Sequence, residues 1–136
     1  MDAFDADVLI YAAIAGHPLG QRVRALFPTE AGQLAGVGSV LLLPEVLANP
    51  MREGVEEEMT ALVGLLSRLE LRWVDAVTAE VATSMAVAYR LRAADAVHLA
   101  TAIVAGATRF ITNNRRDFPA GIGEIDVTYP EALDTG

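Results

Sequence analysis

The chain has 136 residues, of which 53% are hydrophobic, and its 18 acidic against 10 basic residues give a formal net charge of −8. A chain of this length fits one domain with a single sizeable core, and its acidic balance argues against passive nucleic-acid binding, which depends on a basic surface. The absence of cysteine excludes disulfides and thiolate metal sites, and no apolar run approaches the roughly 18 residues that a membrane span needs.

The first part of the chain alternates short strands with helices. Residues 2–6 are predicted as a strand and 8–15 as a helix, which the breaker residues 16–18 end. An amphipathic helix over 19–29 follows, because its apolar residues recur at helical spacing. A second strand is predicted over 34–38.

Two helices are predicted in the second quarter of the chain. The hydroxyl of Ser39 can cap the first, with Pro44 and Glu45 in its first turn and Asn49–Pro50 at its end. The second covers 51–69, where apolar residues again keep a helical period. Glutamates in its first turns complement the helix dipole.

The second half repeats the alternation of strands and helices. Its predicted elements are a strand over 71–74, a helix capped by Thr78 and running to Leu91, a helix over 94–105 that Gly106 ends, a strand over 109–112, a polar loop over 113–119 and a short strand over 125–127. Alternation of this kind indicates a mainly parallel sheet of four to five strands covered on both faces. We therefore expect a three-layer α/β/α sandwich, and a single domain over residues 1–136.

Three acidic residues are set in apolar sequence, where carboxylates are rarely found without a partner. Asp5 lies where the first predicted strand should end, Glu45 lies within an apolar run, and Asp95 lies near the start of the helix over 94–105. If folding gathers them, their like charges oppose ionisation unless a cation offsets them. Sites in parallel sheets form at the carboxyl ends of strands, which is where Asp5, Asn113 and Asn114 are expected.

Four segments together resemble the PIN-domain family. They are Phe-Asp-Ala-Asp-Val-Leu-Ile-Tyr at 4–11, Leu-Leu-Leu-Pro-Glu-Val-Leu at 41–47, Ala-Ala-Asp-Ala-Val-His-Leu-Ala-Thr-Ala at 93–102, and Phe-Ile-Thr-Asn-Asn-Arg-Arg-Asp-Phe-Pro at 110–119. The resemblance spans about residues 2 to 127 in the expected order. It implies a metal-dependent ribonuclease that acts on RNA, and small members of this kind are commonly VapC-type toxins paired with an antitoxin protein.

The resemblance also implies roles for individual residues. Asp5, Glu45 and Asp95 match the acidic triad that holds Mg²⁺ or Mn²⁺. Asn114 stands where many members have a fourth aspartate, which puts a second metal in doubt. Asp117 can supply the missing charge, or the site can work with one ion.

Neighbouring residues are assigned supporting roles. Asp7 is favoured as a helix cap, and support of the metal ligands is the second possibility. Ser39 and Thr112 are favoured as helix caps or strand-end hydroxyls, and a role in shaping the site is their second possibility. The candidates for contacts with substrate phosphate are Arg90, Arg92, Arg115 and Arg116, because guanidinium groups match phosphate oxygens. Arg115 and Arg116 fall in the loop expected to border the site, whereas surface salt-bridging is an equal alternative for Arg90 and Arg92.

His98 lies three residues after Asp95 on the same helix face and is interpreted as a packed, hydrogen-bonded core residue rather than a ligand. The glutamates over 53–58 are expected to form a solvated helix start, with a basic antitoxin segment as a possible partner. The first residues lack the basic and apolar stretches of an export signal, so we expect a cytoplasmic protein with no membrane partner. The resemblance to the PIN-domain family, more than the apolar surplus and the helical second quarter, implies a homodimer.

Two other functions compete with the nuclease. The sequence at 5–9 also resembles the nucleophile loop of haloacid-dehalogenase-type phosphatases, but that family needs a lysine and all ten bases of this chain are arginine. The other is a PIN-like module that has lost catalysis and only binds partners. Three retained carboxylates argue against that reading, because without metal they form a costly cluster of like charges.

Overall fold

A five-stranded sheet forms the centre of the computed structural model, which describes residues 1–134. The strands are β1 (Asp2–Phe4), β2 (Gly36–Ser39), β3 (Leu69–Arg72), β4 (Arg109–Ile111) and β5 (Asp126–Thr128). They lie in the order β3-β2-β1-β4-β5, and every neighbouring pair is parallel. The prediction of a mainly parallel sheet of four to five strands is confirmed.

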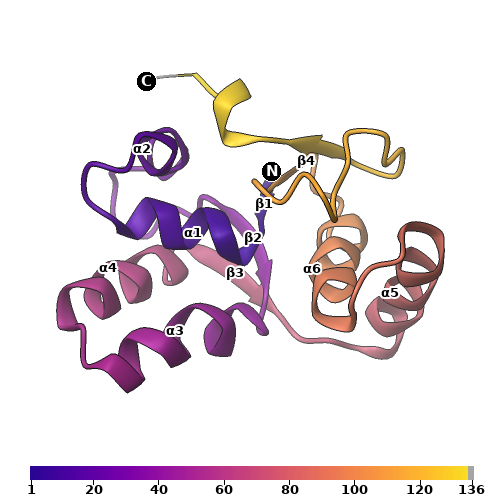
Figure 1. The fold of residues 1–136 in the computed structure, drawn as a ribbon, viewed down its shortest axis with the longest axis horizontal. Coiled ribbons are helices and arrows are strands. Elements are labelled where there is room, and N and C mark those ends of the chain that lie inside the picture. The colour runs from indigo at the N-terminus through magenta and orange to yellow at the C-terminus, as the bar shows by residue number, and fades with distance from the viewer. Residues whose placement is uncertain (135–136) are drawn as a thin grey trace.

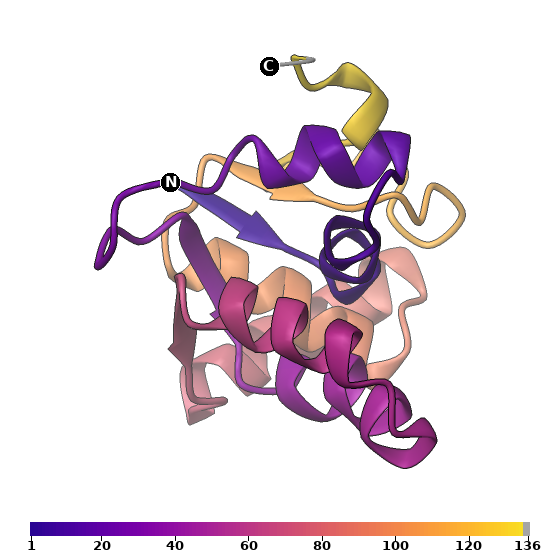
Figure 2. The ribbon, with the colours of Figure 1, turned by 90° about the vertical axis from the view of Figure 1, so that its left-hand side faces the viewer.

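Helices cover both faces of this sheet, which confirms the three-layer sandwich. They are α1 (Ala6–Ala13), α2 (Pro18–Arg24), α3 (Leu42–Glu53), α4 (Glu56–Leu66), α5 (Ala76–Tyr89) and α6 (Ala93–Val104), followed by a short 3-10 turn, η1 (Pro130–Ala132). Figure 1 shows α1 to α4 on one side of the strands and α5 with α6 on the other. Figure 2 looks onto the face that carries α1 to α4, with α5 and α6 behind the strands.

The side-chain alternation of the strands divides the core into two clusters. Ala3 and Phe110 pack on the α5–α6 face, and their neighbours Phe4 and Ile111 pack on the face of α1 to α4. Both faces of the central strands are therefore buried, as a parallel sheet between helices requires. None of the helices within residues 1–134 is long and apolar enough to cross a membrane.

Two helix boundaries in the second quarter differ from prediction. Ser39 ends β2 instead of capping a helix, and α3 starts after Leu41, which makes no side-chain capping bond. Pro50 does not end α3, because the helix continues to Glu53 with Pro50 buried against the core. The stop is Gly54, whose φ of +68° suits glycine, so the single helix predicted over 51–69 is divided.

In the second half, the cap of α5 and both ends of β3 differ from prediction. Asp75 caps α5 by accepting a hydrogen bond from the backbone N–H of Thr78 at 2.8 Å, so the cap predicted at Thr78 is wrong. β3 covers Leu69–Arg72 and not 71–74, so Trp73 lies outside the sheet, with 82% of its surface exposed. Gly106, at φ +74°, follows α6 at the predicted helix end.

Candidate functional site

The strand order places several polar residues beside β1, where the chain switches from adding strands on one side of β1 to adding them on the other. β1 lies between β2 and β4, and the strands built after β1 occupy both of its sides. Asp5 directly follows β1, and Asn113 and Asn114 follow β4, so they share one edge. Such switch points are where parallel α/β sheets form their sites.

A pocket of about 400 Å³ lies at this edge. It is lined by Asp5, Ala6, Asp7, Tyr11, Glu45, Asp95, Asn113 and Asn114. Folding therefore gathers the three predicted acids from α1, α3 and α6, which are separated by up to 90 positions along the chain. It adds Asp7, a fourth carboxylate, to the same wall.

Asp5 is held in place by both of its carboxylate oxygens. The side chain is buried and caps α1, with Oδ1 accepting a hydrogen bond from the backbone N–H of Ala6 at 2.9 Å. Oδ2 accepts from the Thr112 hydroxyl at 2.8 Å, and that hydroxyl in turn accepts from the backbone N–H of Asn114 at 3.1 Å. Thr112 thus connects the end of β1 to the loop after β4.

Asp7 is not the helix cap, because Asp5 occupies that position. Asp7 lies in the first turn of α1, and its Oδ2 accepts a hydrogen bond from the backbone N–H of Asn113 at 3.0 Å. Within residues 1–134, Oδ1 of Asp7 is buried and has no hydrogen-bond partner. Burying a carboxylate oxygen without a hydrogen-bond donor is unfavourable. A cation bound beside Oδ1 of Asp7 would remove this penalty.

Glu45 is oriented by a histidine from another helix. Nε2 of His98 on α6 donates to Oε1 of Glu45 on α3 at 2.9 Å, and the Glu45 side chain keeps 33% of its surface exposed. His98 is buried, in agreement with its interpretation as a packed, hydrogen-bonded residue. Burial lowers the pKa of His98, but the hydrogen bond to Glu45 and the surrounding carboxylates outweigh it and raise the pKa above its ordinary value.

The carboxylates oppose one another's ionisation. Burial, and then the charge of Asp5, raise the pKa of Asp7 from 3.8 to about 7. Burial also raises the pKa of Asp5 above its ordinary value. The pKa of Asp95 is raised by desolvation first and then by the charges of Asp5 and Asp117. Without a cation, the pocket therefore favours protonated acids at a pH where exposed carboxyls are ionised.

The loop after β4 folds on itself beside the pocket. Asn114 donates from Nδ2 to Oδ2 of Asp117 at 2.9 Å, and the backbone N–H of Asp117 donates back to Oδ1 of Asn114 at 3.2 Å. Arg115 pairs with Glu131 at 2.5 Å and lies over the ring of Tyr129, 4.2 Å from its centroid. Asn114 lines the pocket, whereas Arg115 and Asp117 lie outside its lining.

The two remaining predicted site residues, Arg116 and Ser39, lie outside the lining of the acidic pocket. Arg116 is highly exposed and its Nε lies 3.8 Å from Oδ1 of Asp117. Ser39 is buried at the end of β2, and its hydroxyl accepts from the backbone N–H of Leu41 at 3.1 Å. Ser39 thus shapes the entry to α3, the helix that carries Glu45, and is not part of the pocket lining.

Sequence reasoning missed one lining residue, Tyr11, and the role of a second, Asn113, which was expected at this edge. Tyr11 lies one helical turn after Asp7, and this spacing of four was the signal that both share a face of α1. Tyr11 also stacks on His17, with ring centroids 4.5 Å apart. The contribution of Asn113, a backbone donor to Asp7, has no signal in the sequence because it depends on how β4 lies beside β1.

The oxygen atoms that line the pocket are the type of ligand that a hard cation prefers, although they do not converge on a single point. Among residues 1–134, no group of three or more histidine, cysteine or acidic side chains is arranged closely enough to hold a metal ion directly. Mg²⁺ commonly uses one or two carboxylates and retains several waters, so it does not need such a group. The carboxylate lining and the unpartnered oxygen of Asp7 fit that mode of binding.

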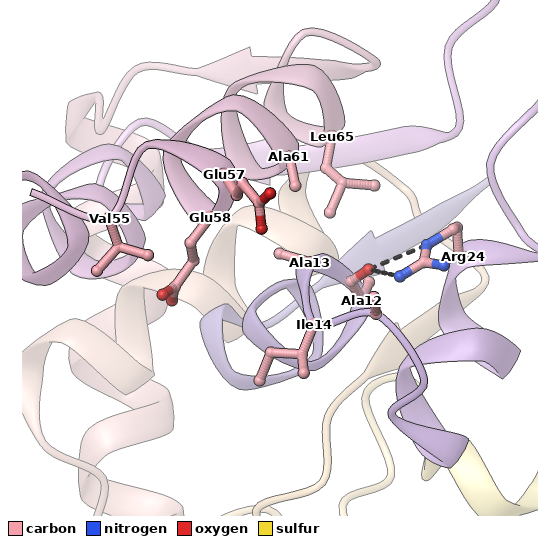
Figure 3. Close-up of a pocket in the computed structure, with 10 residues that line it drawn as sticks. Ala12, Ala13, Ile14, Arg24, Val55, Glu57, Glu58, Ala61 and Leu65 are labelled. Atoms are coloured by element: carbon pink, nitrogen blue, oxygen red, sulfur yellow. Dashed lines mark hydrogen bonds between the residues drawn. The ribbon is translucent and has the colours of Figure 1, made fainter.

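A larger hollow, about 600 Å³ in volume, lies away from the acidic pocket. Figure 3 shows it between the end of α1, with Ala12 and Ile14, and the start of α4, with Glu57 and Glu58. The Arg24 guanidinium borders it and donates from Nε to the Ala12 carbonyl at 3.0 Å. Its lining combines apolar side chains with two acidic side chains and the basic side chain of Arg24.

The fold and site together define an α/β protein with an acidic pocket at the switch point of a parallel sheet. The PIN domain model matches residues 3–120, and the chain therefore belongs to the PIN domain family. This confirms the resemblance drawn from the four sequence segments. No curated protein sequence matches the chain.

Solved structures with the same fold come from toxin–antitoxin complexes. A toxin–antitoxin complex from Klebsiella pneumoniae contains a chain that is 25% identical, with a TM-score of 0.74 over 96% of this chain and 98% of that one. VapBC from Salmonella typhimurium, bound to DNA, gives 19% identity and a TM-score of 0.72 over 95% and 97%. VapBC2 from Rickettsia felis, bound to a promoter DNA fragment, gives 18% and 0.68 over 94% and 97%.

Raising the pH should destabilise the protein when a chelator is present. The raised pKa of Asp7 means that the folded state binds this proton more tightly than the unfolded state does, so the penalty is fully present above about 7 and disappears as the pH falls toward 3.8. Asp7→Asn should therefore be more stable than the wild type by about 1–3 kcal/mol near pH 8, and equal to it near pH 4. Denaturant unfolding across this range measures the difference.

The matched control is Asp126→Asn, which changes an exposed acid on β5. It should leave the slope of stability against pH unchanged. If Asp7→Asn and the wild type keep the same slope, Asp7 does not carry a raised pKa in the folded protein.

Proposed function

We propose that this protein is a metal-dependent ribonuclease that hydrolyses RNA phosphodiester bonds and acts as the toxin of a type II toxin–antitoxin pair. The observation that carries the proposal is the pocket of about 400 Å³ where Asp5, Glu45 and Asp95 meet at the carboxyl edge of the sheet. Membership of the PIN domain family and the fold shared with toxin–antitoxin complexes support it.

The proposed metal ligands are Asp5, Glu45 and Asp95, acting directly or through water. When bound, Mg²⁺ or Mn²⁺ would supply a water of lowered pKa and offset the charge that develops on the phosphate. The Thr112 hydroxyl holds Asp5 in one orientation, and His98 does the same for Glu45. The unpartnered oxygen of Asp7 adds negative potential to the same wall and makes cation binding more favourable.

Asn114 and Asp117 are proposed to share the role of the fourth acid. Asn114 lines the pocket with an uncharged side chain, and Asp117 hydrogen-bonds to it from the same loop. The charge of Asp117 contributes to the raised pKa of Asp95, so it acts on the pocket from outside the lining. This arrangement supports one tightly held ion, with Asp117 as a source of additional negative charge.

The RNA backbone has to approach a chain of net charge −8. Arg115 and Arg116, in the loop that borders the pocket, are the proposed phosphate contacts. Arg115 is paired with a carboxylate in the structure, so binding would exchange Glu131 for a phosphate oxygen. Arg116 is exposed and has a single long contact with Asp117, which leaves it available to a substrate.

The proposal includes a protein partner and self-association. The hollow beside α1 and α4, with its apolar wall and Glu57 and Glu58, suits a basic amphipathic antitoxin segment. A homodimer and a cytoplasmic location are retained as parts of the proposal. The alternative of an inactive PIN-like binding module has one supporting observation, the open arrangement of the acids. A phosphatase of the haloacid-dehalogenase type is disfavoured by the family match.

Asp5→Asn and Asp95→Asn should each reduce RNA cleavage by about a hundredfold or more, because each removes a charge that the cation needs. Both variants should keep the fold and remain at least as stable as the wild type with chelator, since the replaced carboxyls have raised pKa values. Cleavage of a labelled RNA pool, with Mg²⁺ or Mn²⁺ and with chelator, measures the effect.

The control for this assay is Asp126→Asn, which removes an acid of the same type far from the pocket along β5. It should cleave at the wild-type rate. Wild-type activity in Asp5→Asn or Asp95→Asn, or activity that survives chelation, would refute the metal-dependent assignment, and absence of cleavage by every form would favour the inactive binding module.

Reversing the charges of Arg115 and Arg116 together should weaken RNA binding and flatten its dependence on salt. For single-stranded RNA, each lost phosphate contact should lower the slope of log K against log salt by roughly 0.7. Binding is best measured with Asp95→Asn as the background, so that RNA is not cleaved. Arg52→Glu, at the exposed end of α3, matches each single reversal, Arg115→Glu or Arg116→Glu, in net charge, and an equal flattening there would contradict specific contacts.

A further inference from the structure

Tyr11 is the one aromatic side chain among the described residues that line the acidic pocket. The other lining side chains are carboxylates, amides and the methyl group of Ala6, and none of them offers a large flat surface. Tyr11 lies one turn after Asp7 on α1, a rise of about 6 Å along the helix. This separation is similar to the span from a phosphate to the base of the same nucleotide. A phosphate bound among the acids would therefore place a base near Tyr11.

His17 packs against the Tyr11 ring. The ring centroids are 4.5 Å apart and the two planes are within 10° of parallel, so His17 covers one face of Tyr11. Tyr11 lines the pocket, whereas His17 does not. The surface of Tyr11 that borders the pocket is therefore one that His17 leaves uncovered.

The start of α2 holds His17 in this position. Nδ1 of His17 accepts a hydrogen bond from the backbone N–H of Gly20 at 3.1 Å and caps the helix. Gly20 itself lies against the backbone of Tyr11, since a Cβ on Gly20 would stand 2.0 Å from the Tyr11 carbonyl oxygen. The close approach of α2 to α1 thus requires glycine at position 20. It fixes the His17 ring on the Tyr11 ring before any ligand binds.

An aromatic ring held in this way suits a nucleobase. Every base has a flat π-face that stacks on aromatic side chains, and this attraction needs no positive charge. Stacking is therefore open to a chain of net charge −8, in which basic contacts are few. Because His17 already restricts the Tyr11 ring, little side-chain entropy is lost on binding. A purely structural role in joining α1 to α2 would explain the stack, but it would not require Tyr11 to border the pocket.

We propose that Tyr11, backed by His17, is the surface on which the nucleobase next to the cleaved phosphate stacks. The assignment rests on the proposed ribonuclease function and adds a contact with the base to the contacts with phosphate. The Tyr11 ring supplies the stacking surface, and its hydroxyl is not needed for it. Because every base has a π-face, this contact strengthens nucleotide binding without selecting one base.

The test compares a nucleotide with the same molecule lacking its base. Adenosine monophosphate and ribose phosphate, each with Mg²⁺, are probes that require neither cleavage nor a known target. The wild type should bind the nucleotide about tenfold more tightly than the sugar phosphate. Tyr11→Leu should bind the two equally, whereas Tyr11→Phe should keep the preference because it keeps the ring. Titration followed by nuclear magnetic resonance gives the dissociation constants, and the Tyr11 ring protons should move upfield with the nucleotide only.

Two further variants separate the stack from general effects. His17→Asn removes the second ring but keeps the cap of α2, because asparagine is also a good capping residue, and it should reduce the preference for the nucleotide. Trp73→Leu is the matched control, since it removes an exposed aromatic ring outside the acidic pocket and should leave the preference unchanged. The wild-type comparison and Tyr11→Phe do not depend on whether Tyr11→Leu keeps its fold.

Equal binding of the two probes by the wild type would overturn the proposal. So would a loss of preference in Tyr11→Phe as complete as in Tyr11→Leu, or an unchanged preference in His17→Asn. Cleavage of RNA by the wild type is measured separately. A protein that cleaves RNA without preferring the nucleotide refutes the stacking surface and leaves the nuclease, whereas a protein that prefers the nucleotide but cleaves no RNA refutes the nuclease alone.

Discussion

The repulsion among carboxylates at one edge of the sheet is the constraint on which the site depends. β1 and β4 bring Asp5 beside the loop after β4, and α3 and α6 add Glu45 and Asp95 to the same pocket. Burial and mutual repulsion raise the pKa values of three acids there. Hydrogen bonds from Thr112, His98 and the backbone of Asn113 hold the acidic side chains in place and offset part of this repulsion.

Much of the fold could be predicted from local patterns. Strands alternating with helices indicate a parallel sheet, and the sequence segments around Asp5, Glu45 and Asp95 indicate the family, because both signals lie in contiguous residues. The contacts that orient the acids join residues far apart in the chain. His98 and Glu45 are separated by 53 positions, and Asp7 contacts the backbone of Asn113 across 106. Such contacts follow from topology and have no local signature.

The wrong boundaries have the same origin. Pro50 is a helix breaker by local chemistry, yet it is buried within α3, where packing against the core outweighs the lost backbone hydrogen bond. Ser39 is a good capping residue that the sheet recruits to the end of β2 instead. Asp7 precedes a run of apolar residues, as a capping residue often does. In the structure, however, the cap of α1 is Asp5, which accepts a hydrogen bond from the backbone N–H of Ala6. For Pro50 and Ser39, tertiary contacts decide between two locally acceptable roles, whereas the cap at Asp5 is a contact between adjacent residues.

A titration with Mn²⁺, followed by electron paramagnetic resonance of the free ion, tests most directly whether the pocket is a cation site. The wild type should bind Mn²⁺ saturably, Mg²⁺ should compete, and replacement of Asp5 and Asp95 together by asparagine should remove this binding while the fold persists by circular dichroism. Saturable binding that is unchanged in the doubly substituted protein, or no saturable binding by the wild type, would contradict the account.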